Sequence, residues 1–459
     1  MCGLFGAFNW SGVDVSSRLA RLAHRGPDGA GVASAGAAVH GHVRLALVDL
    51  TSASDQPFRY AGAVLSFNGE IWNWREVRHD LQALGRTFST NGDTEVLAQA
   101  LDEWSLDALP RLQGMFAFAW SSRDGRHVLV RDRFGEVPLY VARRGDAYLW
   151  SSERKAFDTS EQAIALPAGT LLDMASGILT RWYDAAAPRP FDPRPIAELL
   201  ARGVTLRATA DAPVCCLISG GLDSTLILHL AHQIAPPGQE VVAYTAKLDS
   251  DSADLRAARR VTDHLGVRLI EVPVQRPDAA ALSAAVKAIE IPSKAQVEIA
   301  AMCMPLAAAI ASDGFKACLS GEAADELFGG YGSMHIKGYR ADDDEWRAVR
   351  LAQLAKMARG NFVRCNKVFM AYGVECRLPF MEQDLVEATL AMSKAQCPPG
   401  KGALKAAAEG LVPRWVIDRQ KDTFQGGAGM IDAAQAAVSD PRGFYASTCK
   451  TIYGPRAKD

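Results

Sequence analysis

The chain has 459 residues, of which 49% are hydrophobic and 22% charged, a composition typical of globular proteins. Its length exceeds that of one ordinary hydrophobic core and predicts two or three domains of roughly 150 residues each. Fifty basic and 52 acidic side chains leave a net charge of -2, so the chain has no excess of positive charge that would favour binding to nucleic acid or a membrane surface. Small molecules are therefore the expected partners.

No stretch approaches the ~20 consecutive apolar residues of a membrane-spanning helix. The residues that follow Met1 lack the basic region and long apolar core of a signal peptide. The nine cysteines are scattered without Cys-x-x-Cys spacing, which disfavours a disulfide framework or structural zinc. We therefore expect a cytoplasmic protein.

Cys2 directly follows Met1, and removal of that methionine would give the cysteine a free α-amino group. A thiol and an amine on one residue supply a nucleophile together with its general base. An isolated cysteine near a terminus is more often a buried core thiol. Polar turns farther along the chain decide between these interpretations, and they occupy residues 24–29, 44–50, 67–73, 91–95 and 131–135.

In this order behind Cys2, the turns resemble the class II glutamine amidotransferase domain of asparagine synthetases, as far as about residue 156. The resemblance implies an Ntn-type αββα sandwich in which Cys2 attacks the side-chain amide of glutamine. It also implies an oxyanion hole made by Asn68 and the backbone N–H of Gly69, donors worth about 10²–10³ in rate each. The glutamine-binding residues that it implies are Arg44, Leu47, Val48, Asn68, Gly69, Glu70 and Asp93. Arg44 suits the carboxylate of glutamine and Asp93 suits its ammonium group.

Residues 184–195 are dense in proline and alanine and predict an interdomain linker. We accordingly predict an amidotransferase domain at 2–183 and an ATP-dependent synthetase domain at 196–459. In the second domain, apolar runs at 214–218, 241–246 and 315–319 alternate with helical patterns. This alternation predicts a doubly wound parallel sheet with helices, whose ligands bind at the carboxyl ends of the strands.

The first of these runs ends in Ser-Gly-Gly-Leu-Asp-Ser-Thr at 219–225, and a helical pattern follows. At such a junction, free backbone N–H groups and the helix dipole favour phosphate oxygens, and Asp223 could hold a magnesium ion against them. A lone Ser-Gly-Gly would be an ordinary turn at about even odds. The full string resembles the pyrophosphate-binding loop of the ATP pyrophosphatases. Because it lacks the Gly-Lys-Ser/Thr of a Walker loop, it favours nucleotidyl transfer over hydrolysis of the γ-phosphate.

The third run leads into Ser-Gly-Glu-Ala-Ala-Asp-Glu-Leu-Phe-Gly-Gly-Tyr at 320–331, which is similar to the SGEG-x-DE-x-FGGY signature of asparagine synthetases. Segments 364–380 and 418–424 extend the resemblance over nearly the whole chain. It implies that Asp325 and Asp223 hold Mg²⁺ and that Glu322 accepts a proton from attacking ammonia. It also implies that Lys421 lies on the pyrophosphate or acyl-adenylate. The ATP-binding residues that we expect are Ile218, Ser219, Gly220, Gly221, Asp223, Ser224, Ala246, Ser320 and Gly321.

One position departs from the family. Asparagine synthetases carry, ahead of the SGEG strand, an arginine associated with the amino-acid substrate, and a gapless alignment from Ser320 puts Glu298 there. Charge reversal at a carboxylate-binding position should repel aspartate and favour an acceptor that presents an amine or another donor.

We therefore predict an ATP-dependent carbon–nitrogen ligase with glutamine as the nitrogen donor, ATP and Mg²⁺ as cofactors, and a carboxylic acid as the acceptor. A first alternative is a β-lactam synthetase-like enzyme that closes an intramolecular amide. Such enzymes carry tyrosine where Glu322 stands and tend to lose the cysteine that is present here as Cys2. A second alternative is a non-catalytic binding or regulatory homologue, which the intact Cys2, Asp223 and Glu322 disfavour. A homodimer is expected only by analogy with the family.

Overall fold

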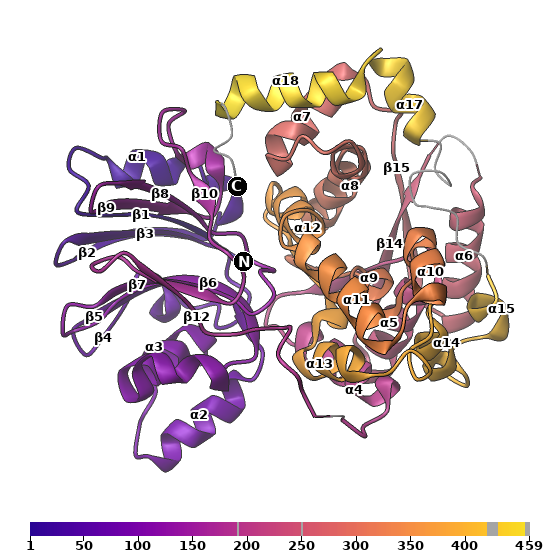
Figure 1. The fold of residues 1–459 in the computed structure, drawn as a ribbon, viewed down its shortest axis with the longest axis horizontal. Coiled ribbons are helices and arrows are strands. Elements are labelled where there is room, and N and C mark those ends of the chain that lie inside the picture. The colour runs from indigo at the N-terminus through magenta and orange to yellow at the C-terminus, as the bar shows by residue number, and fades with distance from the viewer. Residues whose placement is uncertain (191, 249–250, 420–429, 455–459) are drawn as a thin grey trace.

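The computed structural model describes residues 1–459 except 191, 249–250, 420–429 and 455–459. The two halves of the chain fold around separate sheets and lie side by side, with the N-terminus between them (Figure 1).

The N-terminal half contains two antiparallel sheets of six strands each, with strand orders β10-β8-β9-β1-β3-β2 and β12-β11-β7-β6-β5-β4. The first sheet consists of β1 (Gly3–Phe8), β2 (Gly29–Ala35), β3 (Ala38–Arg44), β8 (Tyr140–Arg144), β9 (Ala147–Ser151) and β10 (Ile164–Ala165). The second consists of β4 (Phe58–Tyr60), β5 (Ala63–Ile71), β6 (Gly114–Ser121), β7 (His127–Arg131), β11 (Thr170–Asp173) and β12 (Ile178–Arg181). The helical elements are α1 (Val15–Ala20), η1 (Ala23–Arg25), η2 (Ser52–Ser54), α2 (Trp74–Ala83), α3 (Asp93–Trp104), η3 (Ser105–Arg111) and η4 (Arg154–Ala156).

Strand β6 shows why this half forms four layers. Met115 and Ala117 pack between the two sheets with Leu4 of β1, whereas Phe116 and Phe118 pack under α2 and α3. Successive side chains of a strand point to opposite faces, so one apolar strand can serve two hydrophobic cores. Helix α1 covers the outer face of the first sheet. The predicted αββα sandwich is confirmed.

The C-terminal half is built on one parallel sheet of five strands in the order β15-β14-β13-β16-β17. The strands are β13 (Val214–Leu217), β14 (Val242–Lys247), β15 (Arg268–Pro273), β16 (Ala317–Leu319) and β17 (Glu375–Arg377). From β13 the chain adds strands first on one side and then on the other, so the loops after β13 and β16 meet at a topological switch point. The predicted doubly wound parallel sheet is confirmed, and β15 and β17 are strands beyond the three that the sequence predicted.

Helices surround this sheet on both faces (Figure 1). They are α4 (Ile196–Ala208), α5 (Leu222–Ile234), α6 (Ala253–Leu265), α7 (Ala279–Ile289), α8 (Lys294–Ser312), α9 (Ala324–Phe328), α10 (Gly332–Arg340), α11 (Asp343–Met357), α12 (Asn361–Met370), η5 (Pro379–Met381), α13 (Gln383–Ala391), α14 (Gly402–Ala408), α15 (Arg414–Ile417), α17 (Met430–Ala437) and α18 (Pro441–Tyr453). By length and composition alone, α8 could cross a membrane. Within the fold it packs against α7, α12 and β14, which is the setting of a core helix.

Among the described residues, no helix or strand lies between Arg181 at the end of β12 and Ile196 at the start of α4. The predicted linker, 184–195, falls in this stretch, and its exact bounds stay a prediction.

Candidate functional site

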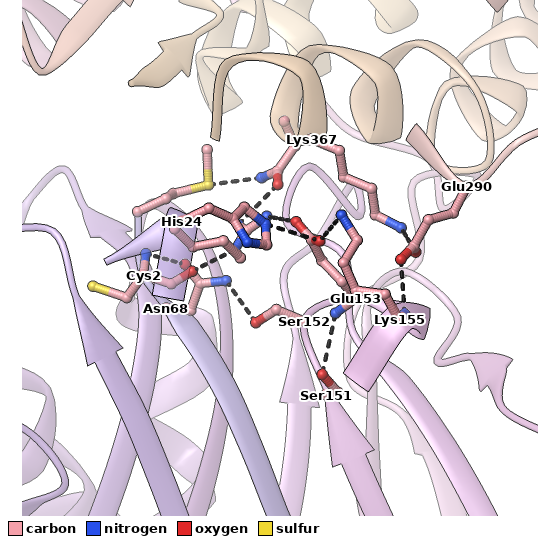
Figure 2. A network of polar contacts seen from close by, with 12 residues as sticks. Cys2, His24, Asn68, Ser151, Ser152, Glu153, Lys155, Glu290 and Lys367 are labelled. Atoms are coloured by element: carbon pink, nitrogen blue, oxygen red, sulfur yellow. Dashed lines mark hydrogen bonds and ion pairs between the residues drawn. The ribbon is translucent and has the colours of Figure 1, made fainter. Parts of the chain in front are cut away.

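Cys2 directly precedes β1, where the two halves of the molecule meet (Figure 2). Its backbone N–H donates to Asn68 Oδ1 at 2.7 Å, and Asn68 Nδ2 donates to Ser152 Oγ at 3.2 Å. Burial raises the pKa of the Cys2 thiol, an effect that the N-terminal ammonium opposes. The thiol therefore needs a base before it can act as a nucleophile.

Gly69 follows Asn68 on β5 in a conformation that favours glycine. Its φ is +143°, and a Cβ there would lie 2.0 Å from the carbonyl oxygen of Met115. Any side chain would collide with the neighbouring strand, so only glycine permits this backbone path beside Asn68. The geometry suits the predicted oxyanion hole, although the roles of Asn68 and Gly69 stay predictions.

The residues predicted to bind glutamine lie around this position. Arg44 is buried, pairs with Asp55 at 2.7 Å and donates to the carbonyl of Thr51 at 2.6 Å. Asp93 accepts the N–H of Ile71 at 2.9 Å, and burial raises the pKa of Asp93 to about 6. Burial, followed by the charge of Glu375, raises the pKa of Glu70 well above its usual value.

Leu47 and Val48 lie where the two halves of the chain meet. The carbonyl of Leu47 accepts the N–H groups of Asp211 and Ala212 at 2.9 and 3.2 Å. These hydrogen bonds connect the N-terminal half to the C-terminal half. Val48 is half-buried beside Leu47. Their part in glutamine binding stays a prediction.

The predicted nucleotide loop connects β13 to α5. Gly220 has a φ of +68°, and a Cβ there would lie 2.5 Å from the backbone of Ala257 in α6. The N–H of Ser219 donates to Ser224 Oγ at 3.2 Å and closes the turn. A Cβ on Gly321 would lie 2.8 Å from the backbone nitrogen of Ser224, so the loop after β16 presses on the first turn of α5.

The other predicted ATP-binding residues lie near this junction. Ile218 is buried, and its N–H donates to the carbonyl of Tyr244 on β14 at 2.9 Å. Ala246 lies near the carboxyl end of that strand, and the N–H of Ser320 donates to the carbonyl of Arg377 at 3.0 Å. Both predicted loops therefore meet at the switch point.

Asp223 and Asp325 face each other across the ammonium of Lys401. Lys401 Nζ lies 2.8 and 2.6 Å from the two carboxylate oxygens of Asp223 and 2.6 Å from Asp325 Oδ1. Lys401 is nearly buried and has a left-handed backbone with a φ of +65°. Sequence reasoning missed this lysine, and its only local signal is the Pro-Pro-Gly-Lys-Gly turn at 398–402.

The two carboxylates therefore converge on one point that a cation can fill, and carboxylate oxygens are the donors that Mg²⁺ prefers. Mg²⁺ fits this donor set if phosphate oxygens complete its coordination. In the part of the chain that the structure describes, no group of three or more His, Cys, Asp or Glu side chains could hold a metal ion without such help.

Glu322 belongs to a polar network at the same edge of the sheet. Arg364 pairs with Glu322 Oε2 at 2.5 Å, and Asn361 Nδ2 donates to Glu322 Oε1 at 2.8 Å and to Glu326 Oε1 at 2.9 Å. Gln296 Oε1 accepts from Arg364 at 2.9 Å. Burial, followed by the charge of Glu322, raises the pKa of Glu326 to about 7. Sequence reasoning had assigned no role to Asn361, Gln296 or Glu326.

Ala323 stands where the family signature has glycine. Its φ is +82°, a left-handed conformation that costs a residue with a Cβ about 1–2 kcal/mol. The loop thus keeps the backbone shape that the family's glycine would permit.

Glu298 is buried on α8 and pairs with Lys294 at 2.7 Å, and its charge contributes to the raised pKa of Tyr445 on α18. Gln296, two residues earlier, faces the site instead. Because residues two apart on a helix point about 200° apart, both side chains cannot face one site. The role of Glu298 in substrate binding stays a prediction, and Lys421 lies outside the described residues.

A polar network links Cys2 to helix α12 (Figure 2). Arg25 donates to the carbonyl of Cys2 at 2.8 Å, pairs with Glu153 at 2.5 Å and donates to Asn366 Oδ1 at 3.0 Å. The next residue of α12, Lys367, pairs with Glu290, and both side chains are fully buried. Since Arg364 of the same helix pairs with Glu322, α12 contacts both candidate sites.

Comparisons with known proteins match both halves of the chain. The family described as "Glutamine amidotransferase domain" matches residues 1–173, and the family described as "Asparagine synthase" matches 195–345 and 340–440. "Asparagine synthetase [glutamine-hydrolyzing] 3" of Arabidopsis thaliana is 30% identical, over 89% of this chain and 75% of the relative. "Asparagine synthetase [glutamine-hydrolyzing] 2" of Oryza sativa subsp. japonica is 29% identical, over 96% of this chain and 80% of the relative.

Among solved structures, a glutamine phosphoribosylpyrophosphate amidotransferase from B. subtilis is 21% identical, over 59% of this chain and 65% of that chain. Its TM-score of 0.35 is too low to support an argument. The sequence matches extend over both halves and carry the assignment. The chain belongs to the asparagine synthase family, as a glutamine-dependent carbon–nitrogen ligase with an amidotransferase domain ahead of its synthetase domain.

Proposed function

We propose that this enzyme adenylates a carboxylic acid with ATP, releases pyrophosphate and transfers ammonia from glutamine to the activated carboxyl group. The observation that carries the proposal is the ion cluster at the switch point. There the nucleotide loop, the acid pair Asp223 and Asp325, and the cation Lys401 converge beside the network of Glu322. Phosphate oxygens, a magnesium ion and a reacting carboxyl group each find suitable partners in this arrangement.

In the first half-reaction, the thiol of Cys2 attacks the side-chain amide of glutamine while the α-amine, freed by removal of Met1, accepts the thiol proton. Asn68 and Gly69 would stabilise the tetrahedral oxyanion. The same amine returns the proton to the leaving nitrogen, so ammonia departs. Water then releases glutamate from the thioester.

In the second half-reaction, a carboxylate oxygen of the acceptor attacks the α-phosphorus of ATP at the loop formed by residues 219–224, and pyrophosphate leaves. Asp223 and Asp325 would hold Mg²⁺, which supplies positive charge to the phosphate oxygens. Lys401 can then move from the two acids to a phosphate. Ammonia attacks the acyl carbon, AMP leaves, and Glu322 accepts the surplus proton.

The side chains around Glu322 suit a polar acceptor. Gln296 and Asn361 present neutral donors and acceptors beside Glu322 and Arg364, so the site suits a polar carboxylic acid. Glu322 favours an enzyme that uses free ammonia, because β-lactam synthetases carry tyrosine at this position. Ring closure by an amine of the acceptor itself stays the second candidate. The cytoplasmic location and the homodimer also stay predictions.

The test is to incubate the protein with ATP, Mg²⁺, glutamine and a panel of carboxylic acids, and to identify products by mass. We expect AMP, pyrophosphate, glutamate and a single amide with an added nitrogen from ¹⁵N-amide glutamine. A Cys2→Ala variant should lose this label transfer but still use ammonium chloride. A product that has lost water without gaining nitrogen would show ring closure, and absent ATP–pyrophosphate exchange with every acid would contradict adenylation.

A further inference from the structure

A carboxylate from the synthetase half holds the N-terminal ammonium of the amidotransferase half. Glu375 on β17 forms an ion pair with the amino group of Met1, and both side chains are buried, with 0% and 1% exposure respectively. Arg377, two residues along the same strand, pairs with Glu375 at 2.6 Å and lies 3.5 Å from Glu70 of the predicted glutamine pocket. The wall of the Cys2 site is therefore partly built from the other domain.

Several charged or titratable groups from different elements surround this ammonium. They are Glu375 and Arg377 from β17, Glu70 from β5, His42 from β3, Asp93 from α3 and Arg25 from η1. Burial alone would raise the pKa of Glu375, but the ammonium and Arg377 outweigh it and hold that pKa below its usual value. The pKa values of Glu70 and Asp93 are raised instead. Glu375 is thus the one of these three acids whose pKa is lowered.

Removal of Met1 moves the amino group by one residue, about 3.8 Å along the chain, onto Cys2 itself. The nitrogen that then carries the charge already lies 2.7 Å from Asn68 Oδ1. The departing side chain, whose sulfur lies 2.8 Å from Asn366 Nδ2, vacates buried space beside Glu375. The carboxylate side chain can extend into that space toward the new ammonium.

We propose that Glu375 is a positioning residue for glutamine hydrolysis: it holds the α-amino group of Cys2 toward the thiol and stabilises the ammonium formed when that amine takes the thiol proton. The Cys2 thiol, its α-amine and Glu375 then resemble other sets of a nucleophile, its base and a third residue that orients the base. As sulfur bonds to the amide carbon, the proton passes from thiol to amine. It leaves with ammonia when the carbon–nitrogen bond breaks.

This role makes the first site complete only when the two domains are docked, because β17 belongs to the synthetase sheet. The inference rests on the proposed function, in which Cys2 is the nucleophile. The experiment must therefore test Cys2 and Glu375 separately.

The test compares Glu375→Gln with the wild type after mass spectrometry has shown that Met1 is absent from both. We expect kcat for glutamate release to fall about 10- to 100-fold, as for other groups that orient a reacting residue. We expect the acid limb of its pH profile to move to lower pH, because losing a negative neighbour lowers the pKa of an ammonium. Product formation from ammonium chloride should persist, and Glu375→Asp should restore part of kcat.

The matched control is Glu290→Gln, which breaks the fully buried ion pair with Lys367. This pair lies within the synthetase half and at the domain interface, where Glu290 also accepts the N–H groups of Arg154 and Lys155, and neither residue pairs with the N-terminal ammonium. The control variant should lower stability without moving the pH profile. An unchanged kcat and pH profile in Glu375→Gln would overturn the inference, as would equal losses of glutamine-dependent and ammonia-dependent synthesis. If Glu375→Gln does not fold, the acid limb of Glu375→Asp decides instead. Glutamate release that survives Cys2→Ala would refute the proposed nucleophile.

Discussion

The ammonium of Lys401 fills the point where a nucleotide-bound cation would have to sit. Breaking such a nearly buried pair by removing one partner costs about 3–5 kcal/mol, because this cation no longer offsets the repulsion between the two carboxylates. Lys401 therefore stabilises the ATP-free site, and if Asp223 and Asp325 hold Mg²⁺ as proposed, Lys401 competes with that ion for both carboxylates.

We predict that Lys401→Met makes the melting temperature depend on Mg²⁺ without nucleotide. The wild type should be nearly insensitive, because its own ammonium neutralises the acids, whereas the variant should be destabilised and then gain stability with millimolar Mg²⁺. Differential scanning fluorimetry over a Mg²⁺ series measures this. Lys405→Met on the exposed side of α14 is the matched control and should behave like the wild type. Equal Mg²⁺ responses in all three proteins would refute the competition.

The raised pKa of Glu326 predicts that the stability of the protein depends on pH. This pKa is about 7 in the folded protein against an ordinary 4.5, so the folded state binds more protons between these values. Stability then falls as pH rises through this window, by up to about 1.4 kcal/mol per unit. Relative to the wild type, Glu326→Gln should gain about 1–3 kcal/mol between pH 5 and pH 8. Urea unfolding at both pH values measures the gain, and an identical difference at each pH would contradict it.

The motifs alone predicted Asp223, Asp325 and Glu322, because each follows a strand within a recognisable string. The sequence did not identify Lys401, because 178 residues separate it from Asp223 in the chain and only the tertiary fold brings the two side chains together. The role of Glu298 stays a prediction. An alignment assigns a position on a helix, and a shift of one residue would turn the side chain by about 100°.

At the scale of elements, the nucleotide loop depends on the close packing of β13, α5 and α6. We predict that Gly220→Ala impairs ATP–pyrophosphate exchange by at least about tenfold, equivalent to 1.4 kcal/mol, because its Cβ would press on the backbone of Ala257. Glutamine hydrolysis at Cys2 should stay near the wild-type rate, since that site lies in the other domain.

The control for this loop variant is Gly238→Ala. Gly238 has a similar φ of +85°, but a Cβ there would meet nothing within 4 Å. The Gly238→Ala variant has a similar backbone strain but lies outside the nucleotide loop, so its rate of ATP–pyrophosphate exchange should be unchanged. Equal losses of exchange in both variants would show that general destabilisation explains the effect.

The strands that the sequence predicted are those with continuous apolar runs, such as 214–218. The sequence did not predict strand β17 (Glu375–Arg377), because two of its three residues are charged. Both charges are buried, and their partners lie on the N-terminus and β5 of the other domain. No pattern local to the strand can therefore identify it, since burial of the charges follows from docking of the domains.

For the molecule as a whole, the domain interface is held by buried ion pairs as well as by apolar contact. Lys367 of α12 pairs with Glu290, whose carboxylate also accepts the N–H groups of Arg154 and Lys155 at 2.8 Å each. The pair thus clamps the start of η4, from the amidotransferase domain, against α7 and α12 of the synthetase domain (Figure 2). Docking of this kind holds both ends of the proposed ammonia path in a fixed relation.

We predict that breaking this clamp destabilises the docked molecule and uncouples its two reactions. Lys367→Met removes the buried cation that pairs with Glu290 and should cost about 3–5 kcal/mol, whereas adding Glu290→Gln should recover part of that loss. Denaturant unfolding of both single variants and the double variant measures the coupling energy. The ratio of glutamate released to amide formed should rise above one in Lys367→Met, because ammonia escapes where the domains separate. Additive stability losses together with a ratio that stays at one would show that the pair neither couples the domains energetically nor confines ammonia between them.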